Sequence, residues 1–288
     1  MTHTLFLKIA LPVIALPALV VLFLPTRVML TYVDVVEPIS LLAGSFLALW
    51  VSFSYRKELK ATFIFLSVFL LIYSLAIVLL LGFSPLLLPY LEPHFGVAET
   101  FHLIQSVQFI NYAMLFLFCI NLLKVIDVKK LNRKGWAIFG IAIIFCYFLA
   151  IYPVLDLIKN FSSLTVPEFS HIAMRILDAS LIIVLVPVLW LYIQYLKSQQ
   201  RQSLTFTVII FGIVCATLFD YLLQLVTIIF PGLIAKDSLL YIPVRELLFI
   251  YGYSIIAVGL YAHRKEDEWG YNTVDKVMNG ELKLVDAK

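Results

Sequence analysis

The sequence predicts an all-α protein, a polytopic bundle of about eight transmembrane helices. Two observations predict this fold class. Hydrophobic residues make up 62% of the chain and charged residues only 14%, with a mean hydropathy of +1.01, whereas soluble domains are about a quarter charged. The apolar residues also gather in continuous runs of about 20 residues, the length that a helix needs to cross a hydrocarbon core about 30 Å thick. This composition excludes a water-soluble fold.

Each apolar run is predicted to be a helix. The runs are continuous and do not alternate with polar residues, and in lipid a helix satisfies every backbone N–H and C=O within its own segment. The predicted spans are Leu5–Leu24, Pro38–Tyr55, Ala61–Phe83, Phe101–Lys124, Gly135–Leu157, Arg175–Leu196, Phe206–Phe230 and Leu240–Ala262.

The first run has a second interpretation, a cleaved signal peptide. Lys8 precedes most of its apolar residues, but the run contains Pro12 and Pro17 and has no clear small-x-small cleavage site. Cleavage leaves seven helices and an N-terminus outside the cell.

Basic residues predict the orientation, because cytoplasmic loops are rich in Lys and Arg. The connections at 56–60, 129–134 and 197–201 are basic, and so is the stretch 263–265. Five of the 21 basic residues fall on the other side, namely Arg27, Lys159, Arg175, Lys236 and Arg245. The prediction is a multi-pass protein of the cell membrane with both termini in the cytoplasm.

A weak internal similarity admits two interpretations, a chance match between apolar helices, which is favoured, and two parallel four-helix repeats. The segment Ser45–Trp50 matches Leu185–Trp190, and in both places a tyrosine and a basic turn follow. Parallel repeats of this kind occur in transporters. Apolar sequences match each other easily, however, which favours the chance match. The predicted domains are a transmembrane domain at 1–263, with candidate halves 1–131 and 132–263, and a polar cytoplasmic tail at 264–288.

Asp220 is the deepest ionisable residue of the predicted spans, with Gln224 one turn away on the same face. A carboxylate in the bilayer interior requires a partner or a water-filled cavity. The functional interpretation is a proton, cation or ligand site. An interhelical hydrogen bond that fixes packing is the structural alternative.

Polar residues concentrate in the outer half of the predicted bundle. The fourth span carries a stripe of amides and Tyr112, and outer helix ends add Glu37, Asp156 and Arg175. This asymmetry predicts a polar cavity that opens outward. The candidate ligand-binding residues are His102, Gln105, Gln108, Asn111, Asp178, Asp220, Gln224, Arg245 and Glu246.

No residue is assigned a catalytic or metal-ligating role, and no cofactor is identified. The outer histidines His94, His102 and His171 have neither the i, i+4 spacing of a helical zinc site nor a clear haem-ligand arrangement. Phosphate-binding loops and nucleophile elbows are absent from the sequence. Cys119, Cys146 and Cys215 lie inside apolar runs and are interpreted as small buried hydrophobes.

Three classes of function remain, of which the first is favoured. It is a non-enzymatic sensor or a subunit of a membrane complex, which contacts the lipid bilayer and a membrane or cytoplasmic protein and has no nucleic-acid partner. The second is a secondary transporter that uses Asp220 as its coupling or substrate-binding group. The third is a membrane enzyme or redox subunit that uses the outer histidines.

Overall fold

The structure is a computed structural model of the whole chain. It describes residues 15–17, 19–20, 26–55, 57–78, 106–124, 128–160, 166–197, 207–217 and 241–268. These residues are helical or lie in short turns, and none of them forms a strand. The predicted all-α class is therefore confirmed for the part of the chain that is described.

Most of the helices are long. Two of them carry no label and are named by their first and last residues. The helix bounds are α2 Thr26–Ser52, α3 Lys57–Ile77, the Ser106–Lys124 helix, the 3₁₀ turn η2 Val128–Lys130, α5 Arg133–Asn160, α6 Val166–Lys197, the Thr207–Thr217 helix and α8 Tyr241–Glu268. Four stretches within them are long and apolar enough to cross a membrane: Val35–Ser52, Lys57–Ile77, Ser106–Lys124 and Ile172–Gln194. The chain thus has the helices of a membrane-embedded protein.

Several helices extend beyond the predicted spans. The helix α2 starts at Thr26 and contains Pro38, where the span was predicted to begin, and α6 starts at Val166, before the predicted Arg175. The helix α8 continues past Ala262 to Glu268. Hydropathy marks only the part of a helix that lies in lipid, so helical turns in water or headgroups leave no apolar signal.

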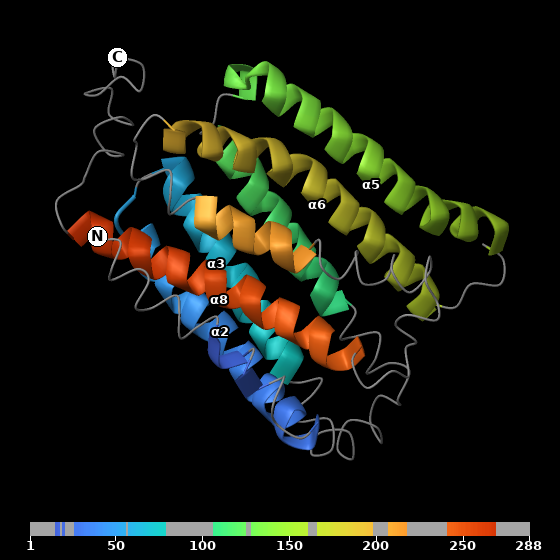
Figure 1. Cartoon of the computed structure of the whole chain (residues 1–288), viewed down its shortest axis with the longest axis horizontal. Coiled ribbons are helices and arrows are strands. Elements are labelled where there is room, and N and C mark those ends of the chain that lie inside the picture. The colour runs from blue at the N-terminus through green and yellow to red at the C-terminus, as the bar shows by residue number, and fades with distance from the viewer. Residues whose placement is uncertain are drawn as a thin grey trace.

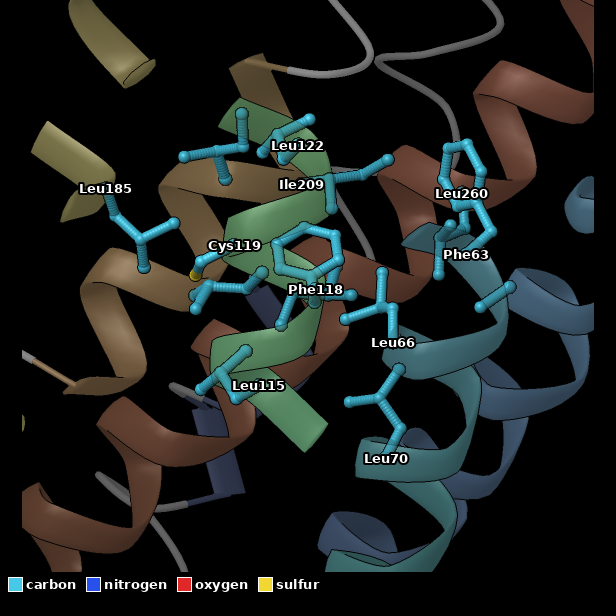
Figure 2. Packing of buried hydrophobic residues seen from close by; sticks show 14 of the residues in the cluster. Phe63, Leu66, Leu70, Leu115, Phe118, Cys119, Leu122, Leu185, Ile209 and Leu260 are labelled. Carbon is cyan, nitrogen blue, oxygen red and sulfur yellow. The ribbon is translucent and has the colours of Figure 1, made fainter. Parts of the chain in front are cut away.

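The long helices lie side by side (Figure 1). The helix α2 packs against both α3 and α8, while α5 packs along α6 at one edge of the bundle. Figure 2 shows that Phe63 and Leu70 of α3 lie beside Leu122 and Leu115 of the Ser106–Lys124 helix in opposite order, so these two helices are antiparallel.

The main hydrophobic core of the described residues joins six helices. Phe63, Leu66 and Leu70 of α3 meet Leu115, Phe118 and Leu122 of the Ser106–Lys124 helix, and Leu185 of α6, Ile209 and Leu260 belong to the same cluster (Figure 2). The helix α2 adds Leu41 and Val51. The helix α5 contributes instead to a small separate cluster, in which Cys146 packs with Ala179 and Ile182 of α6.

Small residues let two helix pairs approach closely. In the α2–α3 pair, Ser45 and Ser67 exchange hydrogen bonds from each side-chain hydroxyl to the other residue's carbonyl, both at 2.9 Å. In α8, a Cβ added at Gly252 would lie 2.9 Å from the Cβ of Ala216. Interfaces between membrane helices use small residues for this reason, because backbones can then come into contact.

Candidate functional site

Three of the nine candidate ligand-binding residues have described side chains: Gln108, Asn111 and Asp178. The helix α8 contains Arg245 and Glu246, whose side chains are not described. The remaining four, His102, Gln105, Asp220 and Gln224, lie outside the described residues. The outward cavity that these residues predicted therefore stays a prediction.

Asp178 is paired with a tyrosine from another helix. The hydroxyl of Tyr112 donates a hydrogen bond to Oδ1 of Asp178 over 2.6 Å. This length is typical of an O–H donor on an ionised carboxylate, which makes a stronger hydrogen bond than a neutral acceptor. The pair connects the Ser106–Lys124 helix to α6 and places the predicted Asp178 between two helices of the bundle.

Asn111 precedes Tyr112 and is only 3% exposed. Its Oδ1 has no hydrogen-bond partner among the described residues. Leu115 and Phe118, one and two turns further along the same face, are core residues. An amide oxygen without a partner in such surroundings is costly, and it is an acceptor that a bound molecule would satisfy.

A second acid lies near a second tyrosine. Glu37 of α2 is 3% exposed and lies within electrostatic range of Tyr253 of α8. Tyr253 is hydrogen-bonded to Tyr73 of α3, their ring centroids are 5.5 Å apart, and Tyr112 is also within electrostatic range of Tyr253. We call Glu37, Tyr73, Tyr112, Asp178 and Tyr253 the acid–tyrosine cluster.

Three members of this cluster lie at a similar depth along their helices. Glu37, Asp178 and Tyr253 each follow the first residue of their helix by about three turns, which is about 17 Å along the axis. Five helices contribute to the cluster, since each member comes from a different one. These polar residues of the predicted outer half therefore meet inside the bundle rather than at separate surface positions.

No protein family, curated protein or solved structure matches this chain. The function is therefore inferred from the residues themselves. Within the described part of the chain, no group of three or more His, Cys, Asp or Glu side chains is placed to hold a metal ion. Of the outer histidines, His94 and His102 lie outside that part, and His171 lies in α6 but its side chain is not described.

The hydropathy pattern does not mark Tyr73 and Tyr253 as part of the site. Tyr253, however, is marked by a repeated spacing in the sequence. The separation in sequence between Glu37 and Asp178 equals that between Tyr112 and Tyr253. In the structure each acid lies near one of these two tyrosines, Asp178 near Tyr112 and Glu37 near Tyr253. This separation is one residue more than that between Ser45 and Leu185 of the suspected duplication, so a search for polar residues repeated near that offset would have found all four.

A different polar group occupies the basic end of the bundle, where α2 and α8 end. The rings of Tyr55, Phe63 and His263 stack with centroids 5.4 to 5.7 Å apart, and Tyr55 is hydrogen-bonded to His263. Arg264 donates to Ser54 and lies 4.9 Å from the ring of Trp50. His263 belongs to the basic stretch 263–265 that follows the last predicted span, yet its side chain is buried.

Burial determines the protonation of this histidine, which lies just beyond the predicted eighth span. Loss of water lowers the pKa of His263 from 6.5 to about 4, because the charged imidazolium is poorly solvated there. The ring is therefore neutral near pH 7. A neutral imidazole stacked on Phe63 ties α3 to α8.

Proposed function

We propose that the protein is a non-enzymatic, multi-pass membrane protein that binds a small ligand at the acid–tyrosine cluster, as a sensor or as the ligand-binding subunit of a membrane complex. In this proposal eight helices cross the cell membrane with both termini in the cytoplasm, and the cluster lies in the outer half. The partner that receives the signal is a membrane or cytoplasmic protein at the basic end.

The main support for this proposal is that two carboxylates, from α2 and α6, converge with tyrosines inside an apolar bundle. Each carboxylate in a bilayer interior costs about 2.5 to 3.5 kcal/mol. Helix packing needs only hydroxyls or amides, which contribute about 0.6 to 2 kcal/mol per contact. Two buried or half-buried acids among tyrosines, and on one of the same helices the unsatisfied amide oxygen of Asn111, exceed what packing requires, and this excess supports a binding role.

The available groups favour a ligand that carries hydrogen-bond donors or a positive charge. Glu37 and Asp178 provide carboxylate acceptors, Asn111 adds an amide oxygen, and the tyrosine rings present π faces. Ammonium groups are bound by carboxylates and aromatic faces together. Primary amines and amino acids are accordingly the first probes.

The test is ligand-induced stabilisation of the purified protein in detergent. We expect at least one of a panel of primary amines, amino acids, sodium and potassium to raise the melting temperature of the wild type, since a ligand that binds only the folded state stabilises it. Asp178→Asn should abolish the rise, while the matched change Glu58→Gln, at an exposed acid on α3, should preserve it. A panel that leaves the wild type unmoved contradicts the proposal.

A secondary transporter is the second candidate, and the equal sequence separation of the two acids and the two tyrosines favours it. This repetition supports two equivalent halves at 1–131 and 132–263, because each acid–tyrosine pair then joins one half to the other. Transporters built from parallel repeats bind their substrates at the interface of the repeats. Rocking of the halves would break one set of contacts and expose the site to the other side of the membrane.

Flux separates the two candidates. If the protein is a transporter, proteoliposomes should accumulate the stabilising solute, and Asp178→Asn or Asp220→Asn should stop the uptake. If the solute stabilises the protein but does not enter the vesicles, the sensor or subunit remains. Asp220 is tested separately because its position lies outside the described residues.

A further inference from the structure

The junction between the start of α5 and the end of α6 is held by one side chain. Oδ1 of Asn132 accepts hydrogen bonds from the backbone N–H of Gly135 at 2.8 Å and from Nε1 of Trp190 at 3.1 Å. The backbone N–H of Asn132 donates to Oε1 of Gln194 at 3.1 Å. These bonds cap α5 and fix the last turns of α6 beside it.

Gly135 allows the indole ring to lie against α5. A Cβ at this position would stand 2.5 Å from Cδ1 of Trp190 and 2.5 Å from Leu131. Such distances are too short for any real contact, so the ring would have to move. The position of the Trp190 ring is therefore fixed by the packing of the helix junction.

A pocket of about 390 Å³ opens at this junction. It is lined by Asn132, Lys134, Trp190, Ile193 and Gln194. The adjoining stretch 128–134 contains four basic residues and no acid, and its first turn, η2, packs against α6. The pocket thus combines the apolar residues Trp190 and Ile193 with the basic residue Lys134 in its lining, which suits an anion that carries an apolar tail.

Lys134 also stands at the head of an apolar stripe on α5. Counting in steps of three and four residues, Ala137, Ile141, Ile144 and Phe148 follow it on the same face, and all four side chains are exposed. Trp136, half exposed near the pocket, is the residue type that marks the membrane interface. A soluble anion would not contact this apolar stripe, whereas the acyl chains of a lipid would cover it.

We propose that the pocket at Asn132, Lys134 and Trp190 binds the phosphate headgroup of an anionic phospholipid, whose acyl chains lie along the Ile141–Phe148 stripe of α5. The inference rests on the membrane embedding of the proposed function and is independent of its ligand. Basic pockets between membrane helices bind anionic headgroups through charge at the bilayer surface. The lipid joins α5 to α6 at the basic end.

Native mass spectrometry of the protein in detergent tests the proposal. Phosphatidylglycerol and phosphatidylcholine with the same acyl chains are added in turn, and the lipid-bound fraction is measured. We expect the wild type to retain phosphatidylglycerol over phosphatidylcholine and Lys134→Gln to weaken its binding about fivefold. The matched control is Lys159→Gln, an exposed lysine in the last turn of the same helix, which should bind like the wild type.

Three results overturn the proposal: equal retention of the two lipids, equal loss in the Lys134 and Lys159 variants, or full displacement of phosphatidylglycerol by millimolar glycerol phosphate, which would indicate a site for soluble anions. Asp178→Asn should leave lipid binding unchanged. A wild type that shows no amine-induced stabilisation but retains phosphatidylglycerol would therefore count against the proposed ligand site alone, and the reverse result against the lipid pocket alone.

Discussion

The hydroxyl of Tyr112, on the Ser106–Lys124 helix, donates a 2.6 Å hydrogen bond to Asp178 of α6. Removing the donor should destabilise the fold. We expect Tyr112→Phe to lower the free energy of unfolding by about 1 to 2 kcal/mol, since the carboxylate then keeps its desolvation cost without its partner. Chemical unfolding of the detergent-solubilised protein measures this.

Tyr147→Phe is the matched control for that change. Tyr147 lies on α5 and is exposed, so loss of its hydroxyl should change stability by less than about 0.5 kcal/mol. Equal effects of the two substitutions would mean that the bond between Tyr112 and Asp178 contributes nothing measurable. A double-mutant cycle with Asp178→Asn then isolates the pair from other contacts of either residue.

Stability should fall as the pH is lowered toward 4, because of His263. Its pKa is lowered to about 4 in the folded protein against 6.5 in the reference state, so between these values the unfolded chain binds the extra proton. The stabilising contribution is therefore complete above pH 6.5 and is lost as the pH falls, up to about 3 kcal/mol for the full shift. Melting temperatures at several pH values between 7 and 4 measure the loss.

His263→Phe should flatten this pH dependence, since the ring can stay in the stack with Phe63 but no longer titrates. Tyr55→Phe removes the hydrogen bond to His263 and leaves the histidine titratable, so its pH dependence should persist. A slope that survives in His263→Phe assigns the effect to other groups.

Two glycines should respond to alanine in opposite directions. In Gly252→Ala the new Cβ would stand 2.9 Å from the Cβ of Ala216. Because this distance is too short, α8 and the Thr207–Thr217 helix would have to move apart, which costs about 1 to 3 kcal/mol. Nothing lies within 4 Å of a Cβ at Gly140, where alanine should stabilise α5 by about 0.5 to 1 kcal/mol. Thermal melting of both variants gives the signs, and a stabilised Gly252→Ala would refute the close contact.

The turn η2, which precedes α5, and the last turn of α5 should be accessible from opposite sides of the membrane. Cys119, Cys146 and Cys215 are buried, so the native thiols should react slowly with maleimides. We expect Lys130→Cys to be labelled by an impermeant maleimide only after the cells are opened, and Lys159→Cys in intact cells. Labelling of Lys130→Cys in intact cells would invert the predicted orientation.

The helices could be predicted from the sequence because apolar runs of membrane length have few other stable conformations. Their ends could not. The first turns of α2 and α6 carry Thr26, Arg27 and Glu168, and a hydropathy window excludes such residues although they continue the helix. The predicted spans therefore begin late wherever a helix extends beyond the lipid.

The site was predictable only in its polar members. Asp178 and Asn111 stand out in an apolar sequence, because a charged or amide side chain is costly in such surroundings unless it has a partner. Tyr73 and Tyr253 are not, since aromatic residues make up 15% of the chain. Which tyrosine meets a carboxylate depends on helix rotation, which a hydropathy pattern does not give, and the equal spacing of the two acids and two tyrosines marks Tyr253 but not Tyr73. The burial of His263 was missed because the neighbouring arginine and lysine are typical of a solvated segment.

The length of α5 has a consequence for the response to bilayer thickness. Its 28 residues span about 42 Å, more than the hydrocarbon core of about 30 Å, and its buried Cys146 packs in a small cluster with α6 rather than in the main core. A helix that is too long for its bilayer relieves the mismatch by tilting. In a thin membrane α5 should therefore lean while the main core keeps its packing, and the mechanical load would fall on the bonds of Asn132.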